Sequence, residues 1–238
     1  MRLLLLVCLV VALSGAMTWS RGLVGYWPFE GTRLDASGNG RTAYGVNTVY
    51  GPGVFGQCDT FNGTTYDTIR DADALSFSDG SNDLPYTMTA WVRIKATGTV
   101  NYILAKRTAA LGEWGFSIRK SGGVGMVLYS GGGNSYFMAE TSAAGTVPAG
   151  TWTHVAVSYN GNKDTSGVTL YINGKPVSKY PYSSGYYVGM QPTSSIVYVG
   201  VLTDRYYNTG RIDEVSIWNR VLSARDIRRV MMGMSPIE

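Results

Sequence analysis

The chain of 238 residues has little charge and no extended basic segment. Charged residues make up 15% of the sequence, and the formal net charge at pH 7 is only +4. Lys and Arg are scattered until the stretch "RDIRRVM" close to the C-terminus. Weak, dispersed basicity of this kind does not indicate nucleic-acid binding, so we expect no nucleic-acid partner.

Histidine and glutamate are also scarce, which limits the possible catalytic chemistry. The single histidine, His154, stands in "GTWTHVAVSYNG", and no strained G-x-S-x-G turn supplies a serine nucleophile for it. Glycoside hydrolysis needs two carboxylates about 5–9 Å apart in one groove. The five glutamates show no such pattern, and strand alternation would turn the adjacent Asp213 and Glu214 to opposite faces. We therefore expect no catalytic residue and interpret His154 as a scaffold position.

Cysteine is nearly absent, and one of the two cysteines lies in an apolar N-terminal segment. "MRLLLLVCLVVALSGA" has a positive charge at Arg2, a short apolar run and the small residues Ser14 and Ala16. This layout predicts a secretory signal peptide over residues 1–16, with cleavage after about Ala16. A retained membrane anchor, or a true start at Met17, remains an alternative. With Cys8 in this segment, Cys58 has no partner for a disulfide and is expected to be a small buried group.

Glycine and aromatic residues, by contrast, are abundant. The chain has 31 glycines, 17 tyrosines and 6 tryptophans. Short β-branched and aromatic runs alternate with turn signals, and these runs are "GLVGYWPF", "YTMTAWVRI", "GFSIRK", "GMVLYS", "THVAVSY", "VTLYING", "SIVYVG" and "RIDEVSIW". This spacing is typical of an all-β sandwich or barrel. Asn173-Gly174 predicts a tight hairpin, and Ser223 with Asp226 predicts a capping box at the start of a short C-terminal helix.

Several of these stretches together resemble a known family. "GLVGYWPFEG", "LDASGNGRTA", "GPGVFGQCDTFNG", "GTWTHVAVSYNG", "VTLYINGKPV" and "GRIDEVSIWNRVLSARDI" occur in the order seen in laminin G-like (LamG) domains of the concanavalin A-like type. The resemblance implies a two-sheet antiparallel jelly-roll sandwich over residues 22–232, after a lead-in at 17–21 and before a tail at 233–238. Family members are mostly binding or adhesion modules, frequently for carbohydrate, on secreted or surface proteins and on phage particles, and often hold calcium.

A possible calcium site lies after the first strand. "FEGTRLDASGNG" places Glu30, Asp35 and Asn39 in a glycine-rich loop, and Ca²⁺ takes six to eight oxygen ligands. The resemblance suggests Asp213 of "IDEV" as a further ligand, because the first and last strands neighbour each other in this fold. In the alternative interpretation, Asp35 and Asn39 make Asx-turns and Asp213 caps backbone amides.

Aromatic loops provide the candidate carbohydrate site. Sugar-binding sites set aromatic faces against the apolar side of the ring. From "SKYPYSSGYYVGM" and "LGEWGF" we expect Tyr180, Tyr182 and Trp114 to form an exposed platform. Two Tyr-Tyr pairs follow, Tyr186-Tyr187 and Tyr206-Tyr207. One member of each pair should face the core, and Tyr207 is expected to be buried. Exposed tyrosines without any ligand are the alternative.

These observations lead to two functional hypotheses. The first is a secreted, non-enzymatic, lectin-like module that binds carbohydrate or another surface ligand and holds a structural calcium ion. The second is a structural or adhesive subunit, such as a phage decoration or tail component or a self-assembling cell-surface protein, which would form a homo-oligomer or filament.

Overall fold

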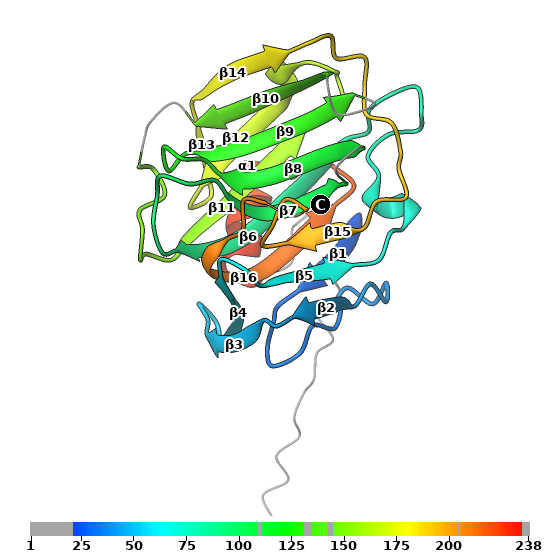
Figure 1. The fold of residues 1–238 in the computed structure, drawn as a ribbon. Coiled ribbons are helices and arrows are strands. Elements are labelled where there is room, and N and C mark those ends of the chain that lie inside the picture. Colours follow the sequence, from blue (N-terminus) through cyan, green and yellow to red (C-terminus); the bar gives the residue numbers. More distant parts are fainter. Residues whose placement is uncertain (1–20, 109–110, 131–134, 142–144, 204, 235–238) are drawn as a thin grey trace, which may run out of the picture.

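The computed structural model describes residues 21–108, 111–130, 135–141, 145–203 and 205–234. The expected signal peptide, Cys8, most of the lead-in and residues 235–238 lie outside this part of the chain. Two antiparallel sheets pack face to face, as the sequence predicts for a jelly-roll sandwich, and Figure 1 looks onto one of them.

Within the described residues, each sheet has eight strands. Sheet A runs in the order β13 (Lys175–Val177), β12 (Val168–Ile172), β11 (Thr153–Tyr159), β6 (Tyr86–Ile94), β16 (Thr209–Trp218), β4 (Gln57–Asn62) and β3 (Val49–Pro52), with β1 (Leu23–Trp27) also paired to β16. Sheet B runs in the order β14 (Lys179–Ser184), β10 (Ser135–Thr141), β9 (Val124–Ser130), β8 (Gly112–Ile118), β7 (Asn101–Arg107), β15 (Val197–Val199), β5 (Tyr66–Ile69) and β2 (Ala43–Val46). Short 3₁₀ turns lie at η1 (Asp73–Leu75) and η2 (Thr165–Gly167).

The core lies between the two sheets. Strand alternation turns every second side chain inward, so that Met88 and Val92 of sheet A meet Trp114 and Phe116 of sheet B in one apolar cluster. We call the side of each sheet that faces away from its partner its outer face. Burying this apolar cluster is the main force that holds the sheets together.

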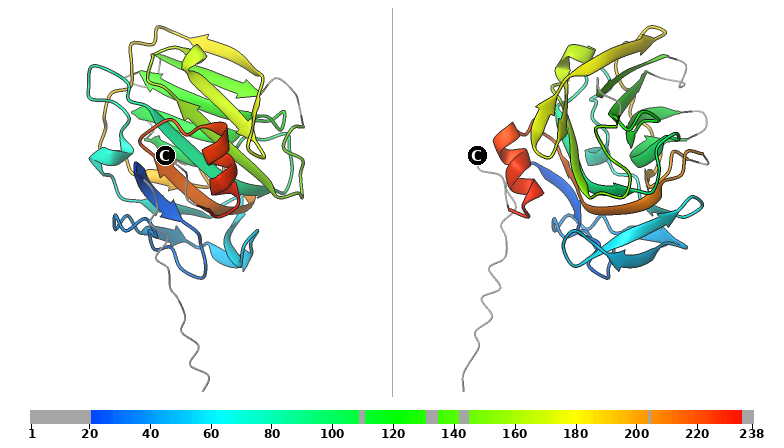
Figure 2. Two further views of the ribbon diagram at one scale, coloured as in Figure 1. Left: turned by 180° about the vertical axis from the view of Figure 1, so that it is seen from behind. Right: turned by 90° about the vertical axis from the view of Figure 1, so that its left-hand side faces the viewer.

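The helix α1 (Ala224–Met231) covers part of the outer face of sheet A (Figure 2). Ser223 Oγ accepts from the backbone N–H of Asp226 at 3.1 Å, which confirms the expected cap. Ile227 packs in a second apolar cluster against Ala156 and Trp218 of the sheet. A surface that would otherwise be open to solvent is thus closed by the end of the chain.

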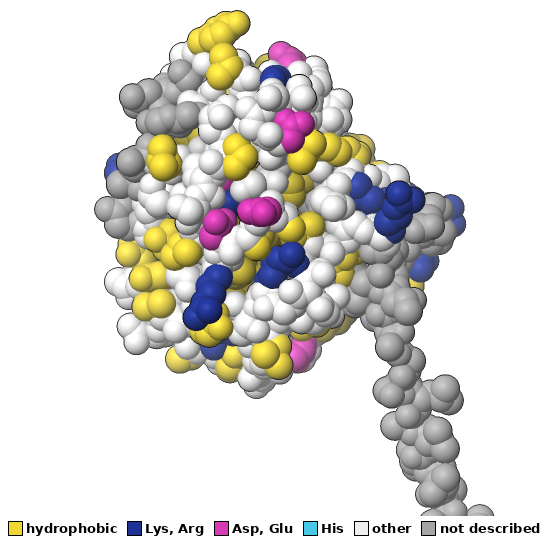
Figure 3. All heavy atoms as spheres, turned by 90° about the vertical axis from the view of Figure 1, so that its right-hand side faces the viewer, with side chains coloured by type: hydrophobic (Ala, Val, Ile, Leu, Met, Phe, Trp, Pro, Cys, Tyr) yellow, Lys and Arg dark blue, Asp and Glu magenta, His cyan; other side chains and the backbone are white. Residues whose placement is uncertain are grey.

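Two further local predictions are confirmed. Asn173 and Gly174 have φ angles of 48° and 70°, as a two-residue turn between β12 and β13 requires. Cys58 is a free, buried thiol. In the described part of the chain, no helix has the length and apolar character needed to cross a bilayer. On the face shown in Figure 3, charged side chains are few and lie among neutral and hydrophobic ones, and two acidic side chains lie side by side near the centre.

Candidate functional site

His154 lies within the scaffold, as expected. Its side chain is 1% exposed on the outer face of sheet A, and the ring of Trp91 meets it edge-on at 5.5 Å. Burial lowers the pKa of His154 to about 3. The imidazole is therefore neutral and screened from solvent, which does not suit a base acting on a substrate.

The side chains of Asp213 and Glu214 do not point in the directions that the sequence predicts. A β-bulge interrupts the pairing of β16 with β6 between Asp213 and Ser216, and Glu214 has a φ of 53°. The bulge breaks the alternation, so that the prediction of opposite faces is wrong. Glu214 Oε2 accepts a 2.5 Å hydrogen bond from the hydroxyl of Tyr26, which lies on the outer side of β1 beside this carboxyl pair.

Asp213 and Glu30 both contact the loop between β3 and β4. Asp213 accepts from the backbone N–H of Val54 at 2.7 Å, and Glu30 accepts from that of Gln57 at 2.9 Å. Gly53 lies in this loop. A methyl group placed on its Cα would lie 2.5 Å from Asp213 Oδ2, 2.5 Å from the carbonyl oxygen of Phe55 and 2.6 Å from that of Gln57. Three oxygen atoms therefore surround the space beside Gly53.

Asp213 and Glu214 have raised pKa values, and Glu30 lies close enough to contribute. Burial, the largest cause, raises the pKa of Asp213 to about 7, and the charge of Glu214 adds to the effect. Burial likewise raises the pKa of Glu214 to about 7, and the charge of Glu30 contributes. Among the described residues, none of the three takes part in an ion pair. In the described part of the chain, these three carboxyl groups therefore have no ion-pair partner.

The other two candidate calcium ligands brace their own loop. Asp35 accepts from the backbone N–H groups of Tyr26 and Ser37 through Oδ1 and from that of Arg41 through Oδ2. The amide of Asn39 donates to the carbonyl oxygens of the first strand. The four predicted ligands therefore fall into two groups. Glu30 and Asp213 each accept a hydrogen bond from the β3–β4 loop, whereas Asp35 and Asn39 tie the loop after β1 to that strand. In the described ranges, no group of three or more His, Cys, Asp or Glu side chains has the proximity needed to hold a metal ion.

Two of the three residues expected in the candidate sugar platform are exposed at the surface. Tyr180 and Tyr182 are 63% and 50% exposed on β14, an edge strand of sheet B. Ser183 of the same strand is the register partner of Phe137, whose side chain packs in the core between the sheets. By strand alternation, the two tyrosines therefore point to the outer face of sheet B.

Trp114 is the exception, and its expected exposure is wrong. Its side chain is 0% exposed and packs in the core, where Nε1 donates to the carbonyl oxygen of Leu75 at 3.0 Å. Its neighbours "GFSI" continue strand β8, and a tryptophan on the inner face of a strand is core, not loop. An indole in this position is unable to stack on a sugar.

The paired tyrosines behave largely as alternation predicts. Tyr186 is exposed, whereas Tyr187 packs against Phe137 and donates to Asp83 at 2.6 Å. In the second pair, Tyr206 is exposed and Tyr207 is only half-buried. Full burial of Tyr207, as expected from the sequence, is therefore not found.

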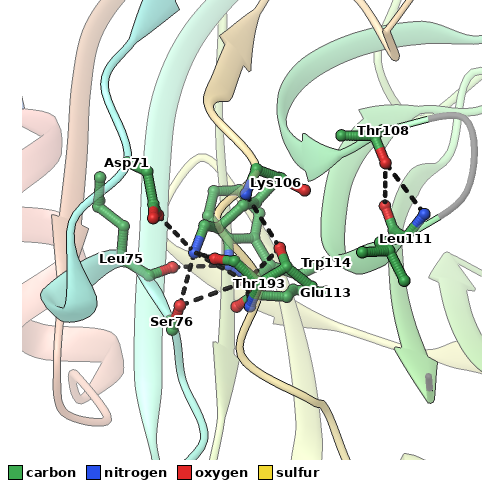
Figure 4. Close-up of polar contacts among 10 residues, drawn as sticks. Asp71, Leu75, Ser76, Lys106, Thr108, Leu111, Glu113, Trp114 and Thr193 are labelled. Atoms are coloured by element: carbon green, nitrogen blue, oxygen red, sulfur yellow. Dashed lines mark hydrogen bonds and ion pairs between the residues drawn. The ribbon is translucent and has the colours of Figure 1, made fainter. Parts of the chain in front are cut away.

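A buried charged cluster around Lys106 was missed by sequence reasoning (Figure 4). Lys106 Nζ lies 2.7 Å from Glu113 and 2.9 Å from Asp71, and it also donates to the hydroxyl of Ser76 at 2.5 Å and to the carbonyl oxygen of Thr193 at 3.1 Å. Lys106 and Glu113 are fully buried. Since Glu113 has no exposed surface, it does not form with Asp71 the open carboxylate pair that glycoside hydrolysis needs.

Comparison with known proteins identifies the family. The model for the concanavalin A-like lectin/glucanases superfamily (Laminin_G_3) matches residues 62–228. The chain belongs to this family. No curated protein matches it.

Solved structures that resemble this LamG-type domain are binding domains. It aligns with the binding domain of Paraclostridial Mosquitocidal Protein 1 at a TM-score of 0.68 and 18% identity, covering 87% of this chain and 51% of that one. Domain 4 of AbnA, a GH43 extracellular arabinanase from Geobacillus stearothermophilus solved in complex with arabinotriose, aligns at 0.60 and 19%, covering 88% and 98%. The binding domain of botulinum neurotoxin DC in complex with rat synaptotagmin II aligns at 0.67 and 14%, covering 89% and 51%. The chain thus spans about half the length of the toxin domains and nearly all of the arabinanase domain.

Proposed function

We propose that the protein is a secreted, non-enzymatic, lectin-like module that binds carbohydrate or another surface ligand through the outer face of β14. The observation that carries this proposal is the exposed pair Tyr180 and Tyr182, held two residues apart on one side of the strand. Their rings offer apolar faces, which suit the C–H surface of a sugar, and hydroxyls, which suit its polar groups. The arabinotriose complex of the arabinanase domain supports a carbohydrate ligand.

A non-catalytic role is supported by the state of the ionisable groups. His154 is buried and neutral. The Lys106–Glu113 pair is sealed inside the sandwich, where it joins β7 and β8 to the loops that precede β6 and β15. Both therefore have structural roles, and the recognition surface consists of exposed aromatic groups.

We also propose that a structural calcium ion binds beside Gly53. Asp213, Glu30 and the loop carbonyl oxygens provide the hard oxygen ligands that calcium prefers, and Glu214 adds charge. A cation at this point would offset the carboxylate charge that has no ion-pair partner among the described residues. Asp35 and Asn39 would support the site indirectly by holding the loop after β1.

The carbohydrate proposal is tested on a glycan array with wild-type protein and the variant Tyr180→Ala/Tyr182→Ala. We expect wild-type binding to a defined set of glycans and a loss of at least tenfold in the variant. Tyr44→Ala is the matched control, since Tyr44 is also 50% exposed but lies on β2, at the opposite edge of sheet B. An absence of glycan binding by the wild type, or an equal loss in the control, would count against the proposal.

A structural or adhesive subunit is the second candidate. It is favoured by the placement of the two exposed tyrosines on an edge strand, where a second copy of the chain could cover them. Sedimentation or light scattering distinguishes the two candidates. A stable trimer or filament that dissociates in the tyrosine variant supports assembly, whereas a monomer supports a lectin-like module.

A further inference from the structure

A second surface, on the outer face of sheet A, gathers positive charge. A groove of about 480 Å³ is lined by Arg93 and Ile94 of β6, by Lys95, and by residues of β4 and β16 including Arg211. Since Ile94 and Ile212 point into the core, alternation turns Arg93, Lys95 and Arg211 outward into this groove. None of the described residues that line it is acidic.

Two of these cations occupy paired positions on neighbouring strands. In the antiparallel pairing of β16 with β6, Arg211 is the register partner of Arg93. Like charges opposite each other on neighbouring strands are destabilising. In the part of the chain that the structure describes, neither they nor Lys95 form an ion pair with an acidic side chain. The sheet therefore retains an unfavourable pair of charges at this point.

Both guanidinium groups are held in place by backbone. Arg93 Nε donates to the carbonyl oxygen of Gly150 at 2.8 Å, and Arg211 donates through one terminal nitrogen to that of Pro52 at 3.0 Å. Gly150 precedes β11 and Pro52 ends β3, so that the two anchors come from segments on opposite sides of the β6–β16 pair. Holding the cations in advance lowers the entropy lost when they bind an anion.

We propose that this groove binds the acidic groups of an anionic polysaccharide, either uronate carboxylates or sulfate esters. Because the two guanidinium groups are anchored on opposite sides of the β6–β16 pair, neighbouring acidic groups of the polymer would each accept charge-assisted hydrogen bonds from one of them. Thr60, Asn62 and Thr209 add neutral polar groups along the same groove, as sugar hydroxyls require. The site is separate from the tyrosine pair on sheet B and does not depend on it.

A polysaccharide suits this groove better than a nucleic acid. The three cations are confined to one groove on one sheet, and the rest of the chain has dispersed charge with a net value of only +4. Nucleic-acid binding depends on many Lys and Arg side chains along an extended surface. One or two acidic sugar units match a short cationic groove with hydroxyl and amide groups beside it.

The test measures binding of polygalacturonate, dextran sulfate, uncharged dextran and duplex DNA by calorimetry. We expect the wild type to bind one of the two acidic polysaccharides, and Arg93→Gln/Arg211→Gln to weaken that binding at least tenfold. Polygalacturonate and dextran sulfate distinguish a carboxylate from a sulfate ligand. The control Lys120→Gln/Arg225→Gln removes the same charge from exposed positions elsewhere and should change affinity less than twofold.

Two further measurements make the result decisive. Inorganic sulfate should raise the Tm of the wild type more than that of the Arg93→Gln/Arg211→Gln variant. Tyr180→Ala/Tyr182→Ala should retain binding to the acidic polymer, so that failure of the tyrosine site is distinguishable from failure of this one. Equal weakening in both charge variants, tightest binding to DNA, or no binding to either acidic polymer would overturn the proposal.

Discussion

The backbone N–H of His154 donates a hydrogen bond to the side-chain Oδ1 of Asn173, 3.0 Å away, and the backbone N–H of Asn173 donates back to the carbonyl oxygen of His154 at 2.8 Å. The turn between β12 and β13 is thus fastened to β11. It extends the pairing of β11 with β12, whose last register partners in this direction are Val155 and Ile172.

Replacement of Asn173 should test this connection. Asn173→Ala removes the acceptor and puts an unfavourable residue at a φ of 48°, so that we expect a loss of about 2 kcal/mol in the free energy of unfolding. Asn173→Gly relieves the backbone strain but does not restore the hydrogen bond. Its stability should therefore lie between those of the wild type and Asn173→Ala. Denaturant titration measures all three proteins, and equal stability of Ala and Gly variants would contradict the backbone contribution.

The pH dependence of stability should reveal the buried His154. Its pKa falls from 6.5 to about 3 on folding, so that the unfolded state binds the extra proton. This contribution is complete above pH 6.5 and is lost as the pH falls towards 3, by about 1.4 kcal/mol per pH unit. Compared with His154→Gln, wild-type stability should decline more steeply between pH 6.5 and 4.5 in denaturant titrations. Parallel curves would show that His154 does not titrate as proposed.

Trp114 should affect stability and leave ligand binding unchanged. Trp114→Phe keeps most of the apolar volume but leaves the carbonyl oxygen of Leu75 without its donor, which should cost about 1–3 kcal/mol. Glycan affinity of the folded variant should equal that of the wild type, because the indole has no exposed surface. A variant that loses glycan binding but keeps wild-type stability would show that Trp114 takes part in ligand binding.

The Lys106 cluster should show strong coupling between its members. Lys106→Met leaves the buried carboxylate of Glu113 without its cation and should destabilise the fold by about 3–5 kcal/mol. Lys106→Met/Glu113→Gln removes the unpaired charge and should recover a substantial part of that loss. A double-mutant cycle by denaturant titration measures the coupling, and additive single losses would argue against the ion pair.

Calcium should stabilise the protein more at high pH than at low pH. The pKa values of Asp213 and Glu214 are raised to about 7, so that without a cation their contribution to stability is lost as the pH rises from about 4 through 7. A bound cation offsets the repulsion between the ionised groups, and the difference in Tm between calcium and chelator should therefore grow from pH 5 to pH 8. Asp213→Asn should abolish that difference, whereas Asp35→Asn should reduce Tm with and without calcium. A calcium effect that persists in Asp213→Asn would place the ion elsewhere.

The sequence by itself determined the all-β class, the Asn173-Gly174 hairpin, the cap at Ser223 and the scaffold role of His154, and the choice of a sandwich came from the family resemblance. These depend on local signals: the two-residue period of buried side chains, a residue pair that tolerates positive φ, and a hydroxyl three residues ahead of an acidic residue. Such local signals predict the structure correctly because the interactions behind each one involve only a few residues of chain or one neighbouring strand.

Only the tertiary structure decided which polar and aromatic groups meet. A bulge in β16 placed Asp213 and Glu214 on one side, β8 carried Trp114 into the core, and Lys106 found its partners on a distant loop and a neighbouring strand. The pairing of Arg93 with Arg211 likewise depends on the register between strands more than 100 residues apart in the chain. Register and bulges are set by the packing of the whole sandwich, because a shift of one residue exchanges the two faces of a strand.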